Sequence, residues 1–169
     1  MKKTITAALA LLMLSGAAGV YAATAGPATG NAQVVIIAPL TLTHNSGAKL
    51  DFGNVINTTA GTVTVAAKDG SVTTSGVTGQ NGTTTADQFT VTGANGIPFT
   101  VSAPSTITVT SGANNMTINS VTSFCGTGAT SSCVASSAGT AVGVGGTLAV
   151  SAAQAVGTYT GTYTLSITY

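Results

Sequence analysis

The chain ends in Gly157-Thr-Tyr-Thr-Gly-Thr-Tyr-Thr-Leu-Ser-Ile-Thr-Tyr169, in which two kinds of residue alternate. A period of two places one set on one face of a β-strand and the hydroxyl-bearing set on the other. The sequence therefore predicts one fully paired strand over 157–169, which we take as a candidate assembly strand. Its first set is Gly157, Tyr159, Gly161, Tyr163, Leu165, Ile167 and Tyr169.

Residues 1–22 have the pattern of an export signal. Lys2 and Lys3 precede an apolar run, Ala7 to Leu14, that is too short to span a bilayer. Small residues before the expected cut predict cleavage between Ala22 and Ala23. The sequence thus indicates an exported protein that passes through the periplasm to the cell surface or the medium.

The charge of the remaining chain is close to zero. Two lysines, Lys49 and Lys68, stand against three aspartates, and there is no arginine, glutamate or tryptophan. Such a surface offers no basic patch for nucleic acid or anionic lipid. A net charge near zero also favours association, which suits a chain that packs against copies of itself.

Cys125 and Cys133 are the only cysteines. An even pair in an exported chain predicts a disulfide. A metal site is the weaker interpretation, because two thiolates need further ligands and the sequence contains a single histidine. We predict no metal and no cofactor.

The segment after the signal divides into two parts. Residues 23–33 are rich in glycine, alanine and threonine and predict a flexible arm, followed by one domain over 34–169. An alternating apolar run overlaps the junction, and its one-face residues are Ala32, Val34, Ile36, Ala38, Leu40 and Leu42. This run is a candidate donor strand for another subunit, or simply the first strand of the domain's own sheet. Pro39 places it at an edge or a sheet switch.

Many short alternating segments separated by turn residues predict an all-β sandwich. The remaining expected strands are 49–56, 61–67, 88–92, 97–103, 106–110, 116–124 and 147–151, with 70–85 as a long exposed hairpin or loop.

No set of residues predicts catalysis. General acid–base chemistry needs a positioned group of tunable pKa, and the three aspartates are dispersed along the chain. Asp69 and Asp87 are expected in turns or loops, Asp51 on a solvent-facing strand position beside Lys49, and His44 in water before a turn. We expect no enzyme, no catalytic residue and no small-molecule substrate.

Three segments carry a family likeness. They are Leu50-Asp-Phe-Gly53 with Gly61-Thr-Val-Thr-Val65, Phe89-Thr-Val-Thr-Gly93, and Val144-Gly-Gly-Thr-Leu148 continuing into Gly157-Thr-Tyr-Thr-Gly161. Together they resemble a family of small exported bacterial pilin-like β domains of unknown function, grouped with fimbrial major subunits. The final strand is similar to that of chaperone–usher pilins, since Gly157 and Tyr169 keep the separation of their glycine and aromatic residue.

The resemblance implies an immunoglobulin-like sandwich whose copies join by β-strand addition into a surface fibre that serves in adhesion. It also implies a periplasmic chaperone and outer-membrane assembly machinery as partners. Two other functions remain open from the sequence. One is a small outer-membrane β-barrel, which the aromatic final strand also fits, and the other is a soluble exported binding module.

Overall fold

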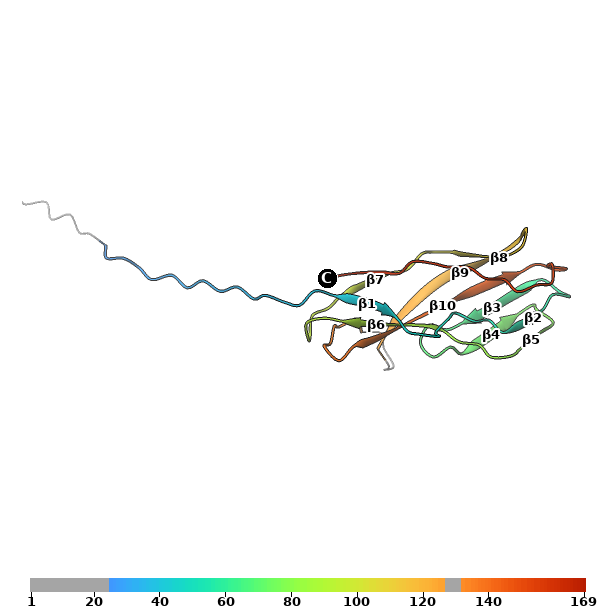
Figure 1. Cartoon of the computed structure of the whole chain (residues 1–169), viewed down its shortest axis with the longest axis horizontal. Helices are drawn as coiled ribbons and strands as arrows, with labels where there is room; N and C mark the ends of the chain where they lie inside the picture. Colours follow the sequence, from blue (N-terminus) through green and yellow to red (C-terminus); the bar gives the residue numbers. More distant parts are fainter. Residues whose placement is uncertain (1–24, 127–131) are drawn as a thin grey trace, which may run out of the picture. The chain divides into compact units, whose positions relative to one another are not determined.

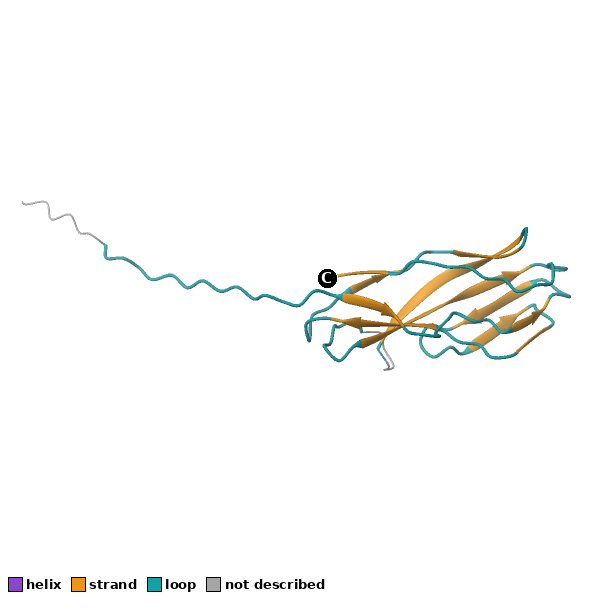
Figure 2. Cartoon of the chain, in the orientation of Figure 1, coloured by secondary structure: helices purple, strands orange, loops and turns teal. Residues whose placement is uncertain are grey.

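The computed structural model describes residues 25–126 and 132–169, and all regular secondary structure in this part of the chain is strand (Figures 1 and 2). These residues contain no helix able to cross a bilayer. The predicted signal and the Ala22–Ala23 cleavage site lie outside the described residues. The strands are β1 (Thr41–His44), β2 (Asn54–Ile56), β3 (Gly61–Val65), β4 (Val72–Ser75), β5 (Gly79–Asn81), β6 (Asp87–Thr92), β7 (Thr100–Ser102), β8 (Ile107–Ser111), β9 (Asn114–Cys125), β10 (Thr140–Val150) and β11 (Ser166–Thr168).

The chain divides into two units, Met1–Val35 and Ile36–Tyr169. In the first, the described residues 25–35 form no strand and are exposed at every position. The second unit holds all eleven strands of the described residues and has the predicted fold, an all-β, immunoglobulin-like sandwich of short antiparallel strands.

Strand β10 is the centre of the largest sheet. It pairs with β9 along one edge, and along the other with β6 in its first half and β3 in its second. The ladder with β9 is irregular between Gly145 and Thr147. On the other edge, the partner changes from β6 to β3 between Val144 and Gly146. A Cβ at Gly145 would overlap the carbonyl oxygen of Val65, so glycine lets the neighbouring backbone cross closely.

The other strands complete this sheet or form small pairs beside it. The sheet runs β1-β6-β10-β3-β4, with β9 and β8 continuing from the other edge of β10. Strands β7 and β11 form one separate pair, and β2 and β5 form another. Strand β1 lies at the sheet edge, as Pro39 predicts.

Two apolar clusters fill the interior. The first core contains Phe52, Val63, Val65, Ala86, Ile107, Met116, Ile118, Leu148 and Val150. The second core contains Phe89, Val91, Phe99, Cys125, Ala135, Val142, Val144 and Leu165. Tyr163 and Val121 pack against both clusters and therefore mark their boundary.

The predicted disulfide between Cys125 and Cys133 is confirmed. Cys125 is buried in the second core, where the bridge ties the end of β9 to the segment that precedes β10. A disulfide indicates an oxidising compartment outside the cytoplasm.

The prediction of a fully paired strand over 157–169 is wrong. Only β11 forms a ladder, with β7, and Thr160 makes one isolated bridge to Thr110 of β8. Likewise, the alternating run over 32–42 is paired only from Thr41 onward. Both segments have the alternating side-chain pattern of a strand, but their backbone hydrogen bonds to a neighbouring strand are incomplete.

Candidate assembly site

A deep apolar groove opens over the first core. Its volume is about 990 Å³, and its two walls are residues 48–55 with Asn57, and residues 154–163 of the C-terminal segment. The floor belongs to β8, β9 and β10, through Ile107, Val109, Met116, Ile118, Leu148 and Val150. Six side chains of the first core therefore also line the groove, which has room for several more apolar groups: Phe52, Ile107, Met116, Ile118, Leu148 and Val150.

The C-terminal wall lies flat on β8. A Cβ at Gly161 would overlap the carbonyl oxygen of Thr108, and one at Gly157 would overlap Oγ of Ser111. The period-two pattern put both glycines in the assembly strand, and the structure explains them by this close approach.

Much of this wall lacks a backbone partner. The amide and carbonyl of Thr160 both bond to Thr110, at 3.0 and 2.8 Å. In the part of the chain that the structure describes, the backbone groups of Tyr159, Gly161 and Tyr163 form no backbone hydrogen bond. Unpaired strand backbone beside an apolar groove is a template for adding another strand.

The opposite wall is better paired. Asp51 exchanges backbone hydrogen bonds with Thr85, and β2 pairs with β5. Lys49 and Asp51, which lie two residues apart, form an ion pair at 2.7 Å. Burial alone would raise the pKa of Asp51, but the hydrogen bonds from Lys49 and from the Gly53 amide hold this pKa below its usual value.

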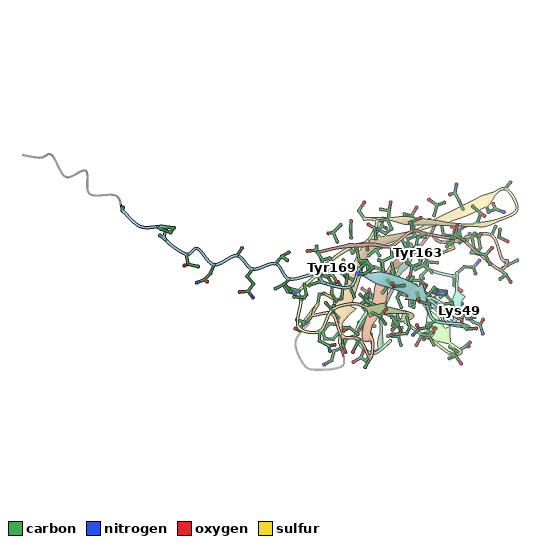
Figure 3. The ribbon with its side chains drawn as sticks, turned by 60° about the vertical axis from the view of Figure 1, so that its left-hand side comes forward. Lys49, Tyr163 and Tyr169 are labelled. Atoms are coloured by element: carbon green, nitrogen blue, oxygen red, sulfur yellow. A yellow bond between two sulfur atoms is a disulfide. The ribbon has the colours of Figure 1, made fainter. Side chains whose placement is uncertain are left out.

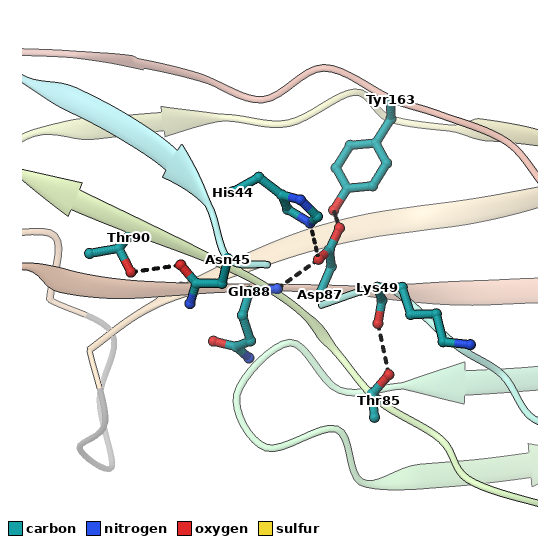
Figure 4. A network of polar contacts seen from close by, with 8 residues as sticks. All are labelled: His44, Asn45, Lys49, Thr85, Asp87, Gln88, Thr90 and Tyr163. Carbon is teal, nitrogen blue, oxygen red and sulfur yellow. Dashed lines mark hydrogen bonds and ion pairs between the residues drawn. The ribbon is translucent and has the colours of Figure 1, made fainter. Parts of the chain in front are cut away.

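Three side chains close one end of the groove (Figure 4). The buried carboxylate of Asp87 contacts His44 Nε2 at 2.7 Å and accepts a hydrogen bond from the Tyr163 hydroxyl at 2.7 Å. These residues come from β1, β6 and the C-terminal segment, so the contacts hold three separate parts of the chain together. We call His44, Asp87 and Tyr163 the polar clasp.

Beyond the polar clasp, the C-terminal segment covers the second core. Leu165 is buried there, and Ile167 packs against the same cluster. The Tyr169 hydroxyl then donates to the Ala38 carbonyl at 2.6 Å, next to the start of β1 (Figure 3). At the opposite end of the groove, the Asn57 side chain donates to the Gln154 carbonyl. The groove therefore lies over the first core and, at the polar clasp, reaches Phe89 of the second core.

Alkaline pH should weaken the polar clasp. Burial, with the Asp87 carboxylate next to it, raises the pKa of Tyr163 far above its usual value, while an unfolded tyrosine ionises near about pH 10. Because the folded pKa is the higher one, the stabilisation is complete below about pH 10 and falls as the pH rises further.

Urea unfolding at pH 8 and pH 11 measures this effect. We expect the free energy of unfolding to fall less over this interval in Tyr163→Phe than in the wild type, since the variant has no phenol to ionise there. Tyr159→Phe, in the same segment, serves as the matched control and should keep the wild-type loss. Equal losses in all three proteins would contradict the role of Tyr163.

The candidate donor residues are exposed. Val34 is 83% exposed and Ile36 is 91% exposed, while Val35 and Ile37 on the other face are 71% and 42% exposed. Only Leu40 and Leu42 of this run pack against the second core. Four consecutive large apolar residues are therefore exposed to water, which is typical of an interaction site.

The sequence interpretation missed the polar clasp. Asp87 was expected in a turn or loop and His44 in water, but Asp87 is 5% exposed and His44 is half exposed and bound to it. A signal was present, because Asp87, Phe89 and Val91 alternate on the buried face of β6. Tyr163 was identified only as one aromatic residue of the final strand.

Comparison with known proteins identifies the family of the domain, but that family has no assigned function. No curated protein and no solved structure shows significant similarity to this chain. Residues 40–169, which contain every strand of the described residues, the groove and the polar clasp, match one family. The chain therefore belongs to the family described as "Domain of unknown function (DUF4402)".

Proposed function

We propose that this protein is a structural subunit of a pilus-like or fimbria-like polymer at the cell surface, in which copies join by β-strand addition. The observation that carries the proposal is the pairing of two incomplete features in one chain. One is an apolar groove with an unpaired backbone wall, and the other is an exposed, alternating apolar segment before β1.

Each feature has the chemistry that the other lacks. In strand addition, the backbone of the added strand forms hydrogen bonds with the sheet edge, and every second side chain enters a pocket and gives specificity. The segment around Val34 and Ile36 offers both. The C-terminal wall offers the free backbone groups of Tyr159, Gly161 and Tyr163 along a groove floored by Met116 and Ile118. Two copies can therefore complete each other head to tail, which extends into a fibre and does not close a ring of two.

The proposed setting is extracellular. The predicted export signal, the disulfide and the low charge are consistent with a protein that leaves the cytoplasm and packs against copies of itself. The role is structural and adhesive, without catalysis or cofactor. A periplasmic chaperone and outer-membrane assembly machinery are the proposed partners in transit.

Material sheared from the surface of cells that export this chain provides the test. On a denaturing gel without heating, we expect a ladder at multiples of the subunit mass, because strand-added contacts resist detergent. Heating should reduce the ladder to the monomer. Monomers alone in unheated samples from both the surface and the periplasm would overturn the proposal.

A further inference from the structure

The polar clasp divides the open half of the domain from the half that is already covered. We propose that His44, Asp87 and Tyr163 form the end stop for the inserted segment of a second copy, so that Ala32 lies at the clasp and Ile36 lies toward Gln154. This inference rests on the proposed function and adds the direction, the depth and the residue that limits insertion.

The direction follows from where each subunit's own segment begins. The Tyr169 hydroxyl donates a hydrogen bond to the Ala38 carbonyl, so the segment before β1 begins next to Tyr169. This is the end of the domain that the C-terminal segment reaches after Tyr163. A neighbouring domain at that end of the groove would overlap the covered half of the same unit, which continues beyond Tyr163 through Leu165 and Ile167 to Tyr169. The neighbour must instead sit near Asn57 and Gln154, and its inserted segment then runs antiparallel to residues 157–163.

The depth follows from side-chain size. On the alternating face, the two large residues Val34 and Ile36 follow the small residue Ala32. With the antiparallel direction, Val34 and Ile36 lie over the first core and only a methyl group reaches Tyr163. Residues 157–163 span about 20 Å at the rise of a strand, which accommodates residues 32–37 of the segment.

The polar clasp resists displacement by an incoming strand. Asp87 is buried, and its carboxylate depends on Tyr163 and His44 for its side-chain hydrogen bonds. Pushing Tyr163 aside would leave a buried charge without one of its two side-chain partners, which is strongly unfavourable. His44 and the Gln88 amide would be its remaining partners, and the methyl side chain of Ala32 offers no donor in place of the Tyr163 hydroxyl, so insertion ends at this point.

Paired cysteines in the full-length exported chain test the direction. The two native cysteines are bonded to each other, so introduced thiols have no native thiol partner. Ala32→Cys is combined with Thr162→Cys, next to the polar clasp, or with Ala155→Cys, at the far end of the same wall. Both wall positions are exposed and line the groove. A disulfide requires Cα atoms within about 7 Å, so one pair at most can form.

We expect the A32C/T162C polymer to retain its ladder after heating without reductant, with most subunits linked, and to collapse to monomer on reduction. The A32C/A155C polymer should give monomer after heating. Heat-stable links in A32C/A155C, or heat-stable links in neither variant, would overturn the inference. If the unheated samples still show ladders, the proposed function remains intact. A link within one chain, found by peptide mapping, would also overturn the inference, and the absence of unheated ladders in the wild type would overturn both proposals.

Discussion

Replacing Val34 and Ile36 together by aspartate is expected to abolish the polymer and leave a folded monomer. Both side chains are almost fully in water in the single subunit, so the domain loses nothing. In the assembly each enters the groove, and burial of such a side chain contributes about 1.5–3 kcal/mol. The loss of both alone weakens each junction by about two to four orders of magnitude. An unpaired carboxylate in the groove adds to that penalty.

The measurement compares unheated ladders with thermal unfolding of the same preparations. The matched control is Val35→Asp, which changes a neighbouring exposed residue on the opposite face of the segment. It should retain most of the ladder, because that face points away from the groove floor. Equal loss in V35D and V34D/I36D would contradict insertion of the alternating face, as would full ladders in V34D/I36D.

Gly145→Val is expected to have the largest effect on folding. The added side chain would overlap the Val65 carbonyl oxygen and the backbone of Ala66 and Ala67 at the point where β10 changes partner. These are backbone atoms of a paired strand and its turn, so they cannot move aside cheaply. We expect a loss of about 3 kcal/mol or more, and a melting temperature lower by about 10 °C or more.

Ala149→Val on the same strand is the control. Its side chain is exposed, and valine favours strands, so its melting temperature should stay within about 2 °C of the wild type. Circular dichroism during heating measures both variants. A Gly145→Val protein that unfolds at the wild-type temperature would mean that the close crossing over β10 does not constrain the fold.

The side-chain pattern predicted the elements in which alternation and pairing coincide. Strands β3, β6, β8 and β9 lie within a residue or two of their expected bounds, since one face of each is buried and the other polar. The first half of β10 was missed. Its Gly143, Gly145 and Gly146 are typical of a loop by composition. Only the crossing of residues 65–67 over Gly143 and Gly145, and the close approach of the Ile118 side chain to Gly146, give glycine a role in the strand.

Pairing itself could not be predicted from the pattern. The segments at 32–40 and 157–165 alternate as regularly as β6, yet both lack a complete ladder. The segment at 70–85, expected as a long exposed hairpin or loop, contains β4 and β5, and their partners β3 and β2 lie earlier in the chain. The polar clasp joins residues 43 and 76 positions apart, a contact that no local spacing encodes.

Immunogold electron microscopy of intact cells, with antibody to residues 40–169, tests the central claim most directly. A structural subunit of a surface polymer predicts gold particles in rows along fibres that extend from the cell, and their loss in cells that export only V34D/I36D. Gold confined to the periplasm of sectioned wild-type cells, with none on surface fibres, would contradict the account.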